Sequence, residues 1–570
     1  MTPLHALADE AGIARLWTDA DRVKQQVSDD SLRAILAALD LPAGSDADIA
    51  ESRKRMKARN AALPKLLTMD FGAPLALPEG LGDFALLDEA GATVAAEALT
   101  RPGYYRLRHS DGEAILAIAP PRCRAIPKRG WGAAIQIPSL VGEGRPFGDF
   151  ALLTEAVTLL GRNGADAVAL SPTHAQSLHQ PGRFAPYSPS SRLALNGLLA
   201  DARCGAPDTD LIDWRTAGPA KLAALRAHFA SQDEQQDFAA FLQARARAGL
   251  NAVQQAARDA GMAIGLIADL AVGVDPAGEE VRDDPGAFLH GLRVGAPPDP
   301  LGPQGQDWGL TSYSPDGLKD RGFAPFIAML RANIPQGGGI RIDHAFGLQR
   351  LWVVPEGRPA SEGAYLAYPF ADLLRLIKLE AWRADAIVIA EDLGTRPPGF
   401  SDTLADAAIY GMAVLPFSRD RKGDFLPANA YPASAVAMSG THDTATIAGW
   451  WTGRDLDWNA ALDRGGDTPA KRSEDRAALW RVIGKGAPQP ADDDPAPVVD
   501  AALAFLAITP CPLAIVPMED LLGLVEQPNL PGTVDEHPNW RRRLPAPIDE
   551  LLARPDVARR IAALNSERDI

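Results

Sequence analysis

Cysteine is scarce in this sequence, with three residues in a chain of 570. Cys123, Cys204 and Cys511 lie far apart, which excludes a disulfide framework and the paired-cysteine spacing of a zinc site. Histidine motifs such as HExxH are missing, and the acid-rich segment 275–284 lacks the spacing of a calcium loop. Walker and dinucleotide fingerprints are missing as well. The sequence therefore predicts reduced thiols, no bound metal and no cofactor.

Positive charge is also in short supply, since 57 Lys and Arg face 73 Asp and Glu and leave a net charge of −16. Such a chain repels phosphate backbones and anionic lipid surfaces, so we expect no nucleic-acid partner and no membrane partner. No uncharged apolar run approaches the roughly 18 residues that span a bilayer, and the acidic start MTPLHALADEAG is unlike a secretory signal. We expect a cytoplasmic protein, and the sequence does not predict its oligomeric state.

Local texture divides the chain into three regions. Residues 1–60 show the capping residues and three- to four-residue apolar spacing of a helical segment. Residues 61–125 contain short alternating runs separated by turn residues, which predicts a β-sandwich-like module. From residue 126 to residue 570, short apolar runs alternate with longer amphipathic stretches, which is typical of βα units.

Eight strand candidates stand in this third region, at 132–138, 165–171, 263–270, 338–343, 386–392, 410–416, 434–440 and 512–518. Eight strands that alternate with helices over more than 400 residues predict an α/β fold, a (β/α)₈ TIM barrel. The second and third strands are too far apart for a plain crossover connection. We therefore expect inserted subdomains at about 175–260 and 275–335.

Four acidic residues stand at the carboxyl ends of predicted strands, namely Asp269, Asp343, Glu391 and Asp443. Functional side chains of such barrels project from that end, because the loops there converge over the axis. Glycosidic chemistry needs two carboxyl groups, since one attacks the sugar carbon while the other protonates the leaving oxygen. Arg341 lies two residues before Asp343 and points the same way, so we expect it to hold Asp343 as an anion. The alternative is a salt bridge that only closes the barrel.

Seven blocks of the sequence carry a resemblance to a known family. They are APYSPSSRLALN, GLIADLAVGVDPAG, VGAPPDPLGPQGQDWGLTSY, GGIRIDHAFGLQRLWVVP, IVIAEDLGT, SGTHDTATIAGWW, and MEDLLGL followed by NLPGTVDEHPNWRRRL. They resemble the conserved blocks of the 4-α-glucanotransferases, also called amylomaltases or disproportionating enzymes, of glycoside hydrolase family 77. The resemblance covers essentially the whole chain, including the N-terminal extension typical of the bacterial branch.

The resemblance implies roles for the three acids within these blocks. Asp343 corresponds to the nucleophile that forms a β-glucosyl-enzyme intermediate, and Glu391 corresponds to the general acid and base. Asp443 corresponds to a third carboxylate that stabilises the transition state by holding sugar hydroxyls. Further family positions implied to contact the substrate are Arg341, His442, His344, Asp269, Tyr187, Gln306, Asp307 and Trp308.

Aromatic residues offer platforms for the flat apolar faces of sugars, but most tryptophans of a large chain are structural. Trp308 is the best candidate, because Gly305 and Gly309 bracket its segment and nothing there has core periodicity. The same segment resembles the family's mobile loop over the acceptor side. Trp382 instead has helical spacing, which predicts a place in the core.

The predicted function is a retaining 4-α-glucanotransferase. It would move segments of α-1,4-glucans from a donor maltodextrin to the 4-hydroxyl of an acceptor glucan or glucose, by double displacement. The first alternative is an α-1,4-glucan hydrolase of the α-amylase type, which shares the acid triad but transfers sugars to water. The second alternative, a non-catalytic glucan-binding barrel, is disfavoured because all three acids are intact.

Overall fold

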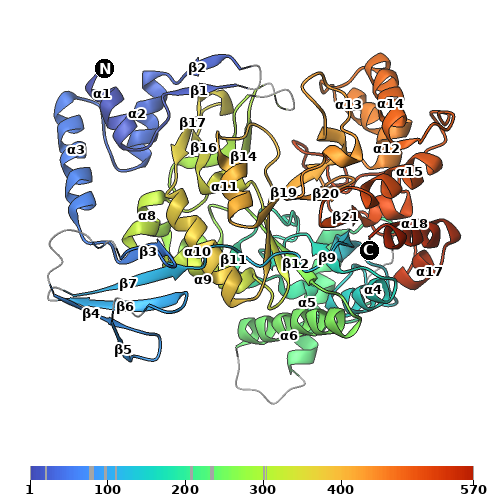
Figure 1. Ribbon diagram of the computed structural model, residues 1–570, viewed down its shortest axis with the longest axis horizontal. Coiled ribbons are helices and arrows are strands. Elements are labelled where there is room, and N and C mark those ends of the chain that lie inside the picture. The colour runs from blue at the N-terminus through green and yellow to red at the C-terminus, as the bar shows by residue number, and fades with distance from the viewer. Residues whose placement is uncertain are drawn as a thin grey trace.

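The computed structural model describes residues 2–19, 22–75, 77, 83–95, 99–109, 112–205, 209–230, 237–298, 302 and 304–568. Its centre is a closed barrel of eight parallel strands (Figure 1). In chain order these are β8 (Gly130–Ile135), β9 (Ala167–Leu170), β12 (Gly265–Leu270), β15 (Gly339–Ile342), β18 (Ile387–Ala390), β19 (Ile409–Val414), β20 (Ala435–Met438) and β21 (Leu513–Pro517). Each overlaps one predicted strand segment, so the predicted barrel is confirmed.

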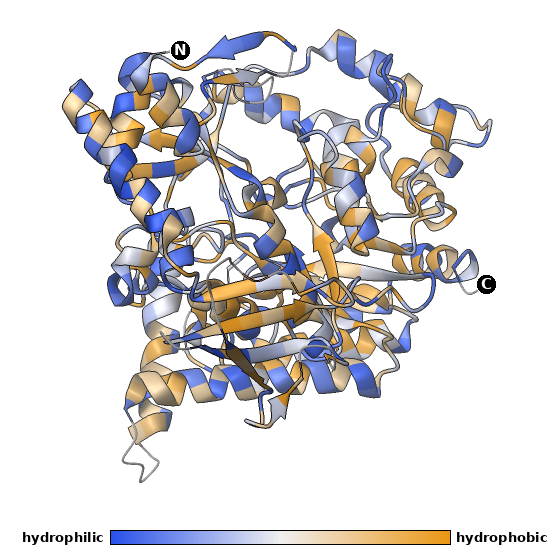
Figure 2. Cartoon of the chain, turned by 60° about the vertical axis from the view of Figure 1, so that its left-hand side comes forward, coloured by the Kyte–Doolittle hydropathy of each residue, from blue (hydrophilic) through white to orange (hydrophobic). Residues whose placement is uncertain are grey.

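Burial on both faces explains why these strands read as continuous apolar runs. Inside the barrel, Ile267, Ile389, Val436 and Ile515 belong to one buried cluster. On the outside, α4 (Phe150–Arg162) turns Leu153 and its neighbours toward the strands, while Glu155 and Arg162 stay exposed. Figure 2 shows the resulting orange strands enclosed by helices with alternating faces.

Helices and short strands follow the barrel strands. Those between β9 and β12 are β10 (His174–Ala175), β11 (Ser191–Leu195), α5 (Trp214–Ala230) and α6 (Phe238–Asp259). The α-helices between β12 and β18 are α7 (Glu279–Asp283), α8 (Pro315–Asp320), α9 (Ala324–Asn333) and α10 (Phe370–Arg383). Later helices are α11 (Phe400–Asp406), α12 (Ile447–Thr452), α13 (Arg454–Ala461), α14 (Pro469–Ile483), α15 (Ala496–Ala507), α16 (Met518–Leu522), α17 (Ile548–Leu552) and α18 (Pro555–Ser566).

A four-stranded antiparallel sheet is formed by segments between the barrel strands β12 and β18, and it packs against the N-terminal helices. Its order is β14-β13-β16-β17, with bounds β13 (Leu292–Ala296), β14 (Gln306–Leu310), β16 (Arg350–Pro355) and β17 (Ala364–Ala367). The N-terminal elements are α1 (Pro3–Glu10), β1 (Leu16–Thr18), β2 (Lys24–Gln26), α2 (Asp29–Ala38) and α3 (Asp46–Ala61). Leu7, Leu32 and Ile35 of these helices share one buried core with Leu351 and Val353 of β16.

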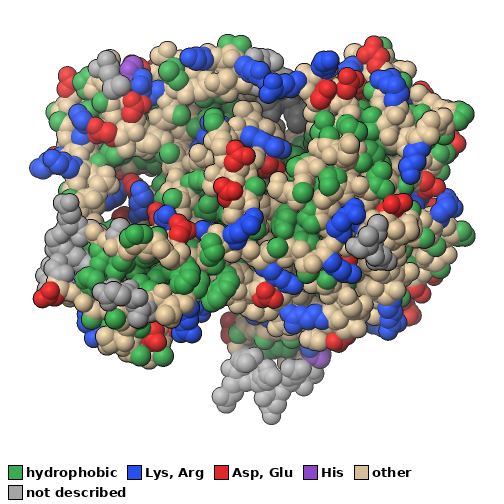
Figure 3. Space-filling model, in the orientation of Figure 1, with side chains coloured by type: hydrophobic (Ala, Val, Ile, Leu, Met, Phe, Trp, Pro, Cys, Tyr) green, Lys and Arg blue, Asp and Glu red, His purple; other side chains and the backbone are tan. Residues whose placement is uncertain are grey.

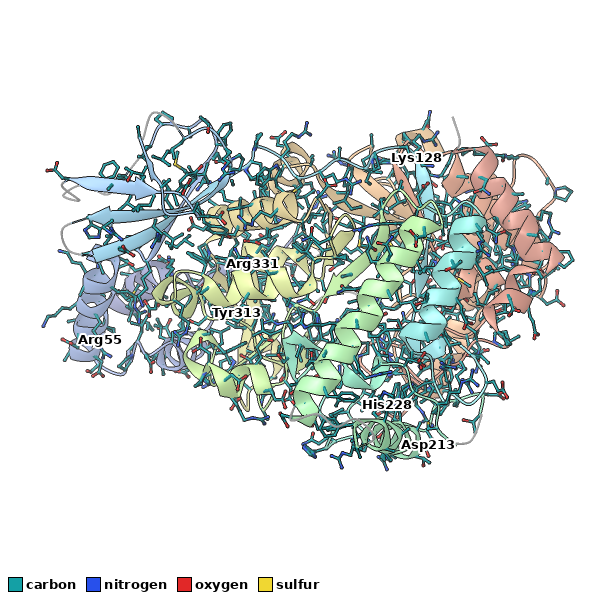
Figure 4. All side chains as sticks on the ribbon, turned by 90° about the horizontal axis from the view of Figure 1, so that it is seen from below. Arg55, Lys128, Asp213, His228, Tyr313 and Arg331 are labelled. Atoms are coloured by element: carbon teal, nitrogen blue, oxygen red, sulfur yellow. The ribbon has the colours of Figure 1, made fainter. Side chains whose placement is uncertain are left out.

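Residues 61–125 were expected to form a sandwich-like module. The described strands form one sheet of order β3-β7-β6-β4-β5, with bounds β3 (Leu66–Asp70), β4 (Phe84–Leu87), β5 (Thr93–Val94), β6 (Gly103–His109) and β7 (Gly112–Ala119). The layer opposite is helix α10 rather than a second sheet, because Leu66 and Ala117 pack into the same cluster as Leu376. Arg331 of α9 lies at this junction (Figure 4), where its guanidinium contacts Glu380 at 2.8 Å.

Trp382 does not lie in the core as predicted. It is 45% exposed near the end of α10, whose apolar face is completed by Leu373, Leu376 and Ile377 one to three turns earlier. On the face shown in Figure 3, acidic and basic side chains are interspersed, so the negative charge is not gathered there in one patch. None of the helices in the described part of the chain is long and apolar enough to cross a bilayer.

Candidate active site

The four predicted acids lie at the carboxyl end of the barrel. Asp269, Asp343 and Glu391 lie on or directly after the neighbouring strands β12, β15 and β18, whereas Asp443 follows β20, which β19 separates from β18. In the parallel ladder Asp269 of β12 pairs with Arg341 of β15, which in turn pairs with Ile389 of β18. Two further backbone bonds extend this ladder past the strand ends, since Asp343 N–H donates to the Leu270 carbonyl at 3.0 Å and Glu391 N–H donates to the Ile342 carbonyl at 2.9 Å. The strand register therefore places Asp343 and Glu391 level with each other, and Asp269 level with Arg341, two residues earlier along the strands.

Arg341 is shared between two carboxylates. Its Nη1 lies 2.6 Å and 2.8 Å from the two oxygens of Asp269 and 3.0 Å from Oδ1 of Asp343. The Asp343 side chain is 18% exposed. Burial raises the pKa of Asp343 to about 6, against the opposing effect of Arg341 and with a further push from Asp269 and Glu391. Asp343 is therefore ionised only above about pH 6, because Arg341 also contacts Asp269 and does not fully offset the effect of burial.

Glu391 is held differently, by backbone donors. Its Oε1 accepts from Leu393 N–H at 2.7 Å and its Oε2 accepts from His344 N–H at 3.0 Å. Burial raises the pKa of Glu391, although Arg341 and these two hydrogen bonds oppose the shift. The clamp depends on a left-handed backbone at His344, where φ is +46°. A non-glycine residue in this conformation is strained, and here the turn directs its N–H at Glu391.

Asp443 stands at the other end of a chain of polar contacts. It lies 3.2 Å from Nε2 of His442 and accepts from the Asn529 amide at 2.6 Å. Burial would raise the pKa of Asp443, but His442 and Asn529 outweigh it and the pKa is lowered. The pKa of His442 is raised, because Asp443 outweighs the effect of burial. Asp443 is thus kept as an anion, with 47% of its side chain open to a ligand.

Tyr187 joins this end to Asp269. Its hydroxyl donates to Oδ2 of Asp269 at 2.5 Å and lies 3.1 Å from Nδ1 of His442. The Tyr187 ring stacks on the His442 ring, with 4.4 Å between the ring centroids. The contacts Asp443, His442, Tyr187, Asp269, Arg341 and Asp343 therefore form one continuous network. This network fixes each group before any ligand arrives, which reduces the reorganisation needed during reaction.

The segment with Gln306, Asp307 and Trp308 was expected to be a mobile loop. Most of it is strand β14, paired with β13. The Trp308 ring meets the His344 ring edge-on at 5.1 Å, and its Nε1 donates to Oε1 of Gln306 at 3.1 Å. Asp307 accepts from Gly309 N–H at 2.8 Å. Trp308 therefore lies beside the residue after Asp343, whereas the side-chain hydrogen bonds described for Gln306 and Asp307 are to residues of the same segment.

Sequence reasoning missed three residues of this site, Asn529, Trp540 and Glu519. The Trp540 ring lies 5.6 Å from Tyr187 and 5.4 Å from His442, and so completes an aromatic wall. All three belong to the last resembling blocks, MEDLLGL and NLPGTVDEHPNWRRRL, which was the available signal. Among the described residues, no group of three or more His, Cys, Asp or Glu is arranged to hold a metal ion.

Glu519 follows β21 and lines a cavity together with Gln136, Ser171 and Trp540. Burial raises the pKa of Glu519 to about 7, so its neutral form is favoured in the folded state. A carboxyl with a raised pKa contributes stability below its ordinary pKa and loses it as the pH rises through the folded value.

We therefore expect Glu519→Gln to raise the free energy of unfolding at pH 8, by an amount on the order of a few kcal/mol, and to change it little at pH 5. Thermal unfolding of both proteins at the two pH values measures the difference. Glu362→Gln, at an exposed ion pair with Arg358, is the control and should show no such pH dependence. An equal effect of Glu519→Gln at both pH values would contradict the assignment.

Comparisons with known proteins agree with one another. A family model described as 4-alpha-glucanotransferase, glycoside hydrolase family 77, matches residues 202–549. The 4-alpha-glucanotransferase of Haemophilus influenzae is 29% identical over 82% of this chain and 84% of its own length. The 4-alpha-glucanotransferase of Mycobacterium tuberculosis is 29% identical over 97% of this chain and 95% of its own.

Solved structures show the same likeness in three dimensions. The amylomaltase of Corynebacterium glutamicum has a TM-score of 0.89 to this chain at 25% identity, and the match covers 99% of both chains. The amylomaltase of Streptococcus agalactiae has a TM-score of 0.61 at 20% identity, over 77% of this chain and 99% of its own. The N-terminal elements are thus part of the match to the first structure.

Proposed function

The chain belongs to the 4-alpha-glucanotransferases of glycoside hydrolase family 77, which act on α-1,4-glucans, and from this premise we propose that Asp343 and Glu391 carry out a retaining double displacement. The observation that supports this assignment best is that the two buried carboxyls, on adjacent strands, are held by different partners. Asp343 faces the guanidinium of Arg341, which suits an anion that attacks carbon. The pKa of both carboxyls is raised, so the difference lies in their contacts: Glu391 is fixed by two backbone N–H donors, which suits a group that gives and takes a proton.

In the first step, a carboxylate oxygen of Asp343 attacks C1 of the donor glucosyl unit. The bond between C1 and the glycosidic oxygen breaks, and that oxygen takes the proton of Glu391 as the reducing-end fragment leaves. A β-glucosyl ester of Asp343 remains, and Glu391 is now a carboxylate. Arg341 loses one anionic neighbour in this step but keeps its two contacts with Asp269, so it stays in place.

In the second step, Glu391 takes the proton from the 4-hydroxyl of an acceptor, whose oxygen attacks C1. The ester bond breaks, Asp343 returns as a carboxylate, and a new α-1,4 bond forms with retention. Asp443 and His442 present hydrogen-bonding groups to the hydroxyls of the reacting glucose, and Tyr187 with Trp540 supplies an aromatic wall. Trp308, whose ring meets that of His344 edge-on, serves as the platform for the acceptor sugar.

We propose maltodextrins as donors and either a glucan or free glucose as acceptor. The complex of the Streptococcus agalactiae amylomaltase with acarbose supports an oligosaccharide-sized ligand for this fold. The experiment is incubation with maltotriose. We expect glucose together with a ladder of maltodextrins longer than the substrate, whereas products no longer than maltotriose would mean that water is the acceptor.

The rate of transfer should depend on pH through both carboxyls. Asp343 must be ionised to attack, and its pKa is about 6, so kcat/KM falls as the pH drops through about 6. This acid limb lies higher than the ordinary pKa of an aspartate would give. Glu391 must be protonated, so the rate also falls at high pH and the profile is bell-shaped. Initial rates on maltotriose across pH 4–9 measure it, and a rate that stays flat down to pH 4.5 would contradict the role of Asp343.

A further inference from the structure

The N-terminal helical segment packs on the sheet that carries Trp308. Ile13 forms a bridge with Leu366 of β17, flanked by the hydrogen bonds Ala14 N–H to Tyr365 carbonyl and Ala367 N–H to Gly12 carbonyl, both 2.8 Å. These contacts extend the sheet β14-β13-β16-β17 by one short stretch of N-terminal chain. The helices α1 and α2 cover one face of the same sheet, in the core that includes Leu292, Val294 and Val353.

Two tryptophans lie against this shared core from different elements. Trp308 of β14 and Trp17 of β1 are both partly buried against it. Trp308 is the residue beside His344, which directly follows Asp343. Trp17 belongs to the N-terminal hairpin β1-β2 (Figure 1) and has no contact with the catalytic network among the described interactions.

A series of direct contacts links Trp17 to the Trp308 segment. The Trp17 ring meets the fully buried Trp352 ring edge-on at 5.0 Å, and Nε1 of Trp352 donates to the Ala360 carbonyl at 2.9 Å. Ala360 in turn lies against Gly305, where an added Cβ would be only 3.1 Å from the Cβ of Ala360. Gly305 has φ +75° and directly precedes β14. Ala360 therefore backs the turn from which Trp308 is carried.

We propose that Trp17 is a positioning residue for the acceptor side: through Trp352 and Ala360 it fixes the Gly305 turn and hence the place of Trp308. This proposal rests on the proposed role of Trp308 as the acceptor platform. It gives the N-terminal helical segment a part in the reaction, because the wall behind the acceptor platform is built partly from that segment. The leaving fragment of a donor departs from the same subsites that an acceptor enters, so the effect of this wall is measured in the second step, with glucose varied as the acceptor.

The expected consequence is selective. Loss of the Trp17 ring leaves a gap beside Trp352. The turn at Gly305 is then less fixed, and the position of Trp308 varies more. Acceptor sugars then bind less well and the glucosyl ester is lost to water more often, because transfer requires an acceptor to be held while water is excluded. Changes at positions that act through packing alter coupling by amounts equivalent to about two- to thirtyfold in affinity.

The test compares full-length Trp17→Ala, Trp308→Ala and the double variant in reactions with maltotriose as donor and varied glucose as acceptor. We expect Trp17→Ala to raise KM for glucose about three- to tenfold and to lower the ratio of transfer to hydrolysis similarly, with kcat at saturating glucose within about twofold. Trp308→Ala should show the larger effect. The double variant should be no worse than Trp308→Ala alone, because Trp17 acts through Trp308.

Control variants separate positioning from general damage. Trp382→Ala removes an exposed tryptophan near the end of α10, outside the core that this sheet shares with the N-terminal helices, and should match the unmodified enzyme. Trp17→Phe retains a ring against Trp352 and should restore KM to within about twofold. Unfolding midpoints of all variants are measured alongside, and if Trp17→Ala does not fold, Trp17→Leu is judged by the same criteria.

The outcomes distinguish two kinds of failure. If Trp308→Ala impairs acceptor use but Trp17→Ala behaves like Trp382→Ala, the positioning role of Trp17 is wrong and the acceptor role of Trp308 stands. If the two effects multiply in the double variant, the residues act independently and the proposed route is wrong. If Trp308→Ala leaves KM for glucose and the transfer ratio unchanged, the acceptor role of Trp308 fails and the proposal falls with it.

Discussion

Asp343→Asn should lower kcat for maltotriose by about 10⁴-fold or more, because loss of a catalytic nucleophile generally costs several orders of magnitude. The asparagine keeps the shape of the side chain and can still present an oxygen to Nη1 of Arg341, which lies 3.0 Å from Oδ1 of the aspartate. Its amide oxygen is too weak a nucleophile to form the ester. Folding should not suffer, since the variant removes a buried charge whose pKa is already raised to about 6.

Initial rates and unfolding midpoints measured on the same preparation check this expectation. The matched control is Asp385→Asn, the same chemical change just before β18, at the opposite end of the barrel strands. Asp385 is 76% exposed as a side chain and has φ +50°, a conformation that asparagine accepts. The control should retain full activity, whereas turnover by Asp343→Asn within tenfold of the unmodified enzyme would mean that another group is the nucleophile.

The barrel was predictable because its signal is local. Strands buried on both faces need runs of apolar residues, and such runs end where a side chain meets solvent or a ligand. The acids Asp343 and Glu391 were found in this way, as breaks at the ends of apolar runs. The sandwich-like module was less predictable, because a sheet face covered by a helix such as α10 has the same alternation as one covered by a second sheet.

Electrostatics at the site depended on contacts that the sequence does not reveal. The spacing of Arg341 and Asp343 on one strand indicated an ion pair, and the pair exists. Arg341 also binds Asp269, which lies on the neighbouring strand, and Asp343 is buried by residues from several barrel strands and loops. A single sequence shows one partner of an arginine but not how many partners share it, so the raised pKa of Asp343 could not be predicted from this spacing.

Residues of irregular segments were the hardest to predict. Asn529 and Trp540 follow the last barrel strand in a stretch without helical or strand periodicity, and only tertiary packing brings them to Asp443 and Tyr187. Trp382 was predicted to be buried but is exposed. Helical spacing shows which face of a helix is apolar, but not whether another element covers the end of that face. Trp17 had no signal of its own, because its importance lies in which buried ring it meets.

Glu391→Gln should lower the rate of transfer from maltotriose by about 10²- to 10⁴-fold, the usual range for loss of a general acid. The size of this loss should depend on the leaving group, and that dependence identifies the role. A sugar oxygen must be protonated to leave, whereas fluoride leaves as the anion without a proton. Release of fluoride from α-maltosyl fluoride, as Asp343 attacks C1, should therefore remain within about tenfold of the unmodified enzyme in a single turnover.

The second step distinguishes Glu391 further, because the same group must deprotonate the acceptor. Without it the maltosyl ester of Asp343 should accumulate, and mass spectrometry of digested protein should find one maltosyl unit on the peptide that contains Asp343. Glu362→Gln, at an exposed pair with Arg358, should accumulate none. Equal losses with maltotriose and with the fluoride would show that Glu391 supports the structure of the site rather than moving a proton. A maltosyl unit found on another acid would instead mean that this acid is the nucleophile. Glu391 would remain the proton carrier, because the ester accumulates whenever no group deprotonates the acceptor in the second step.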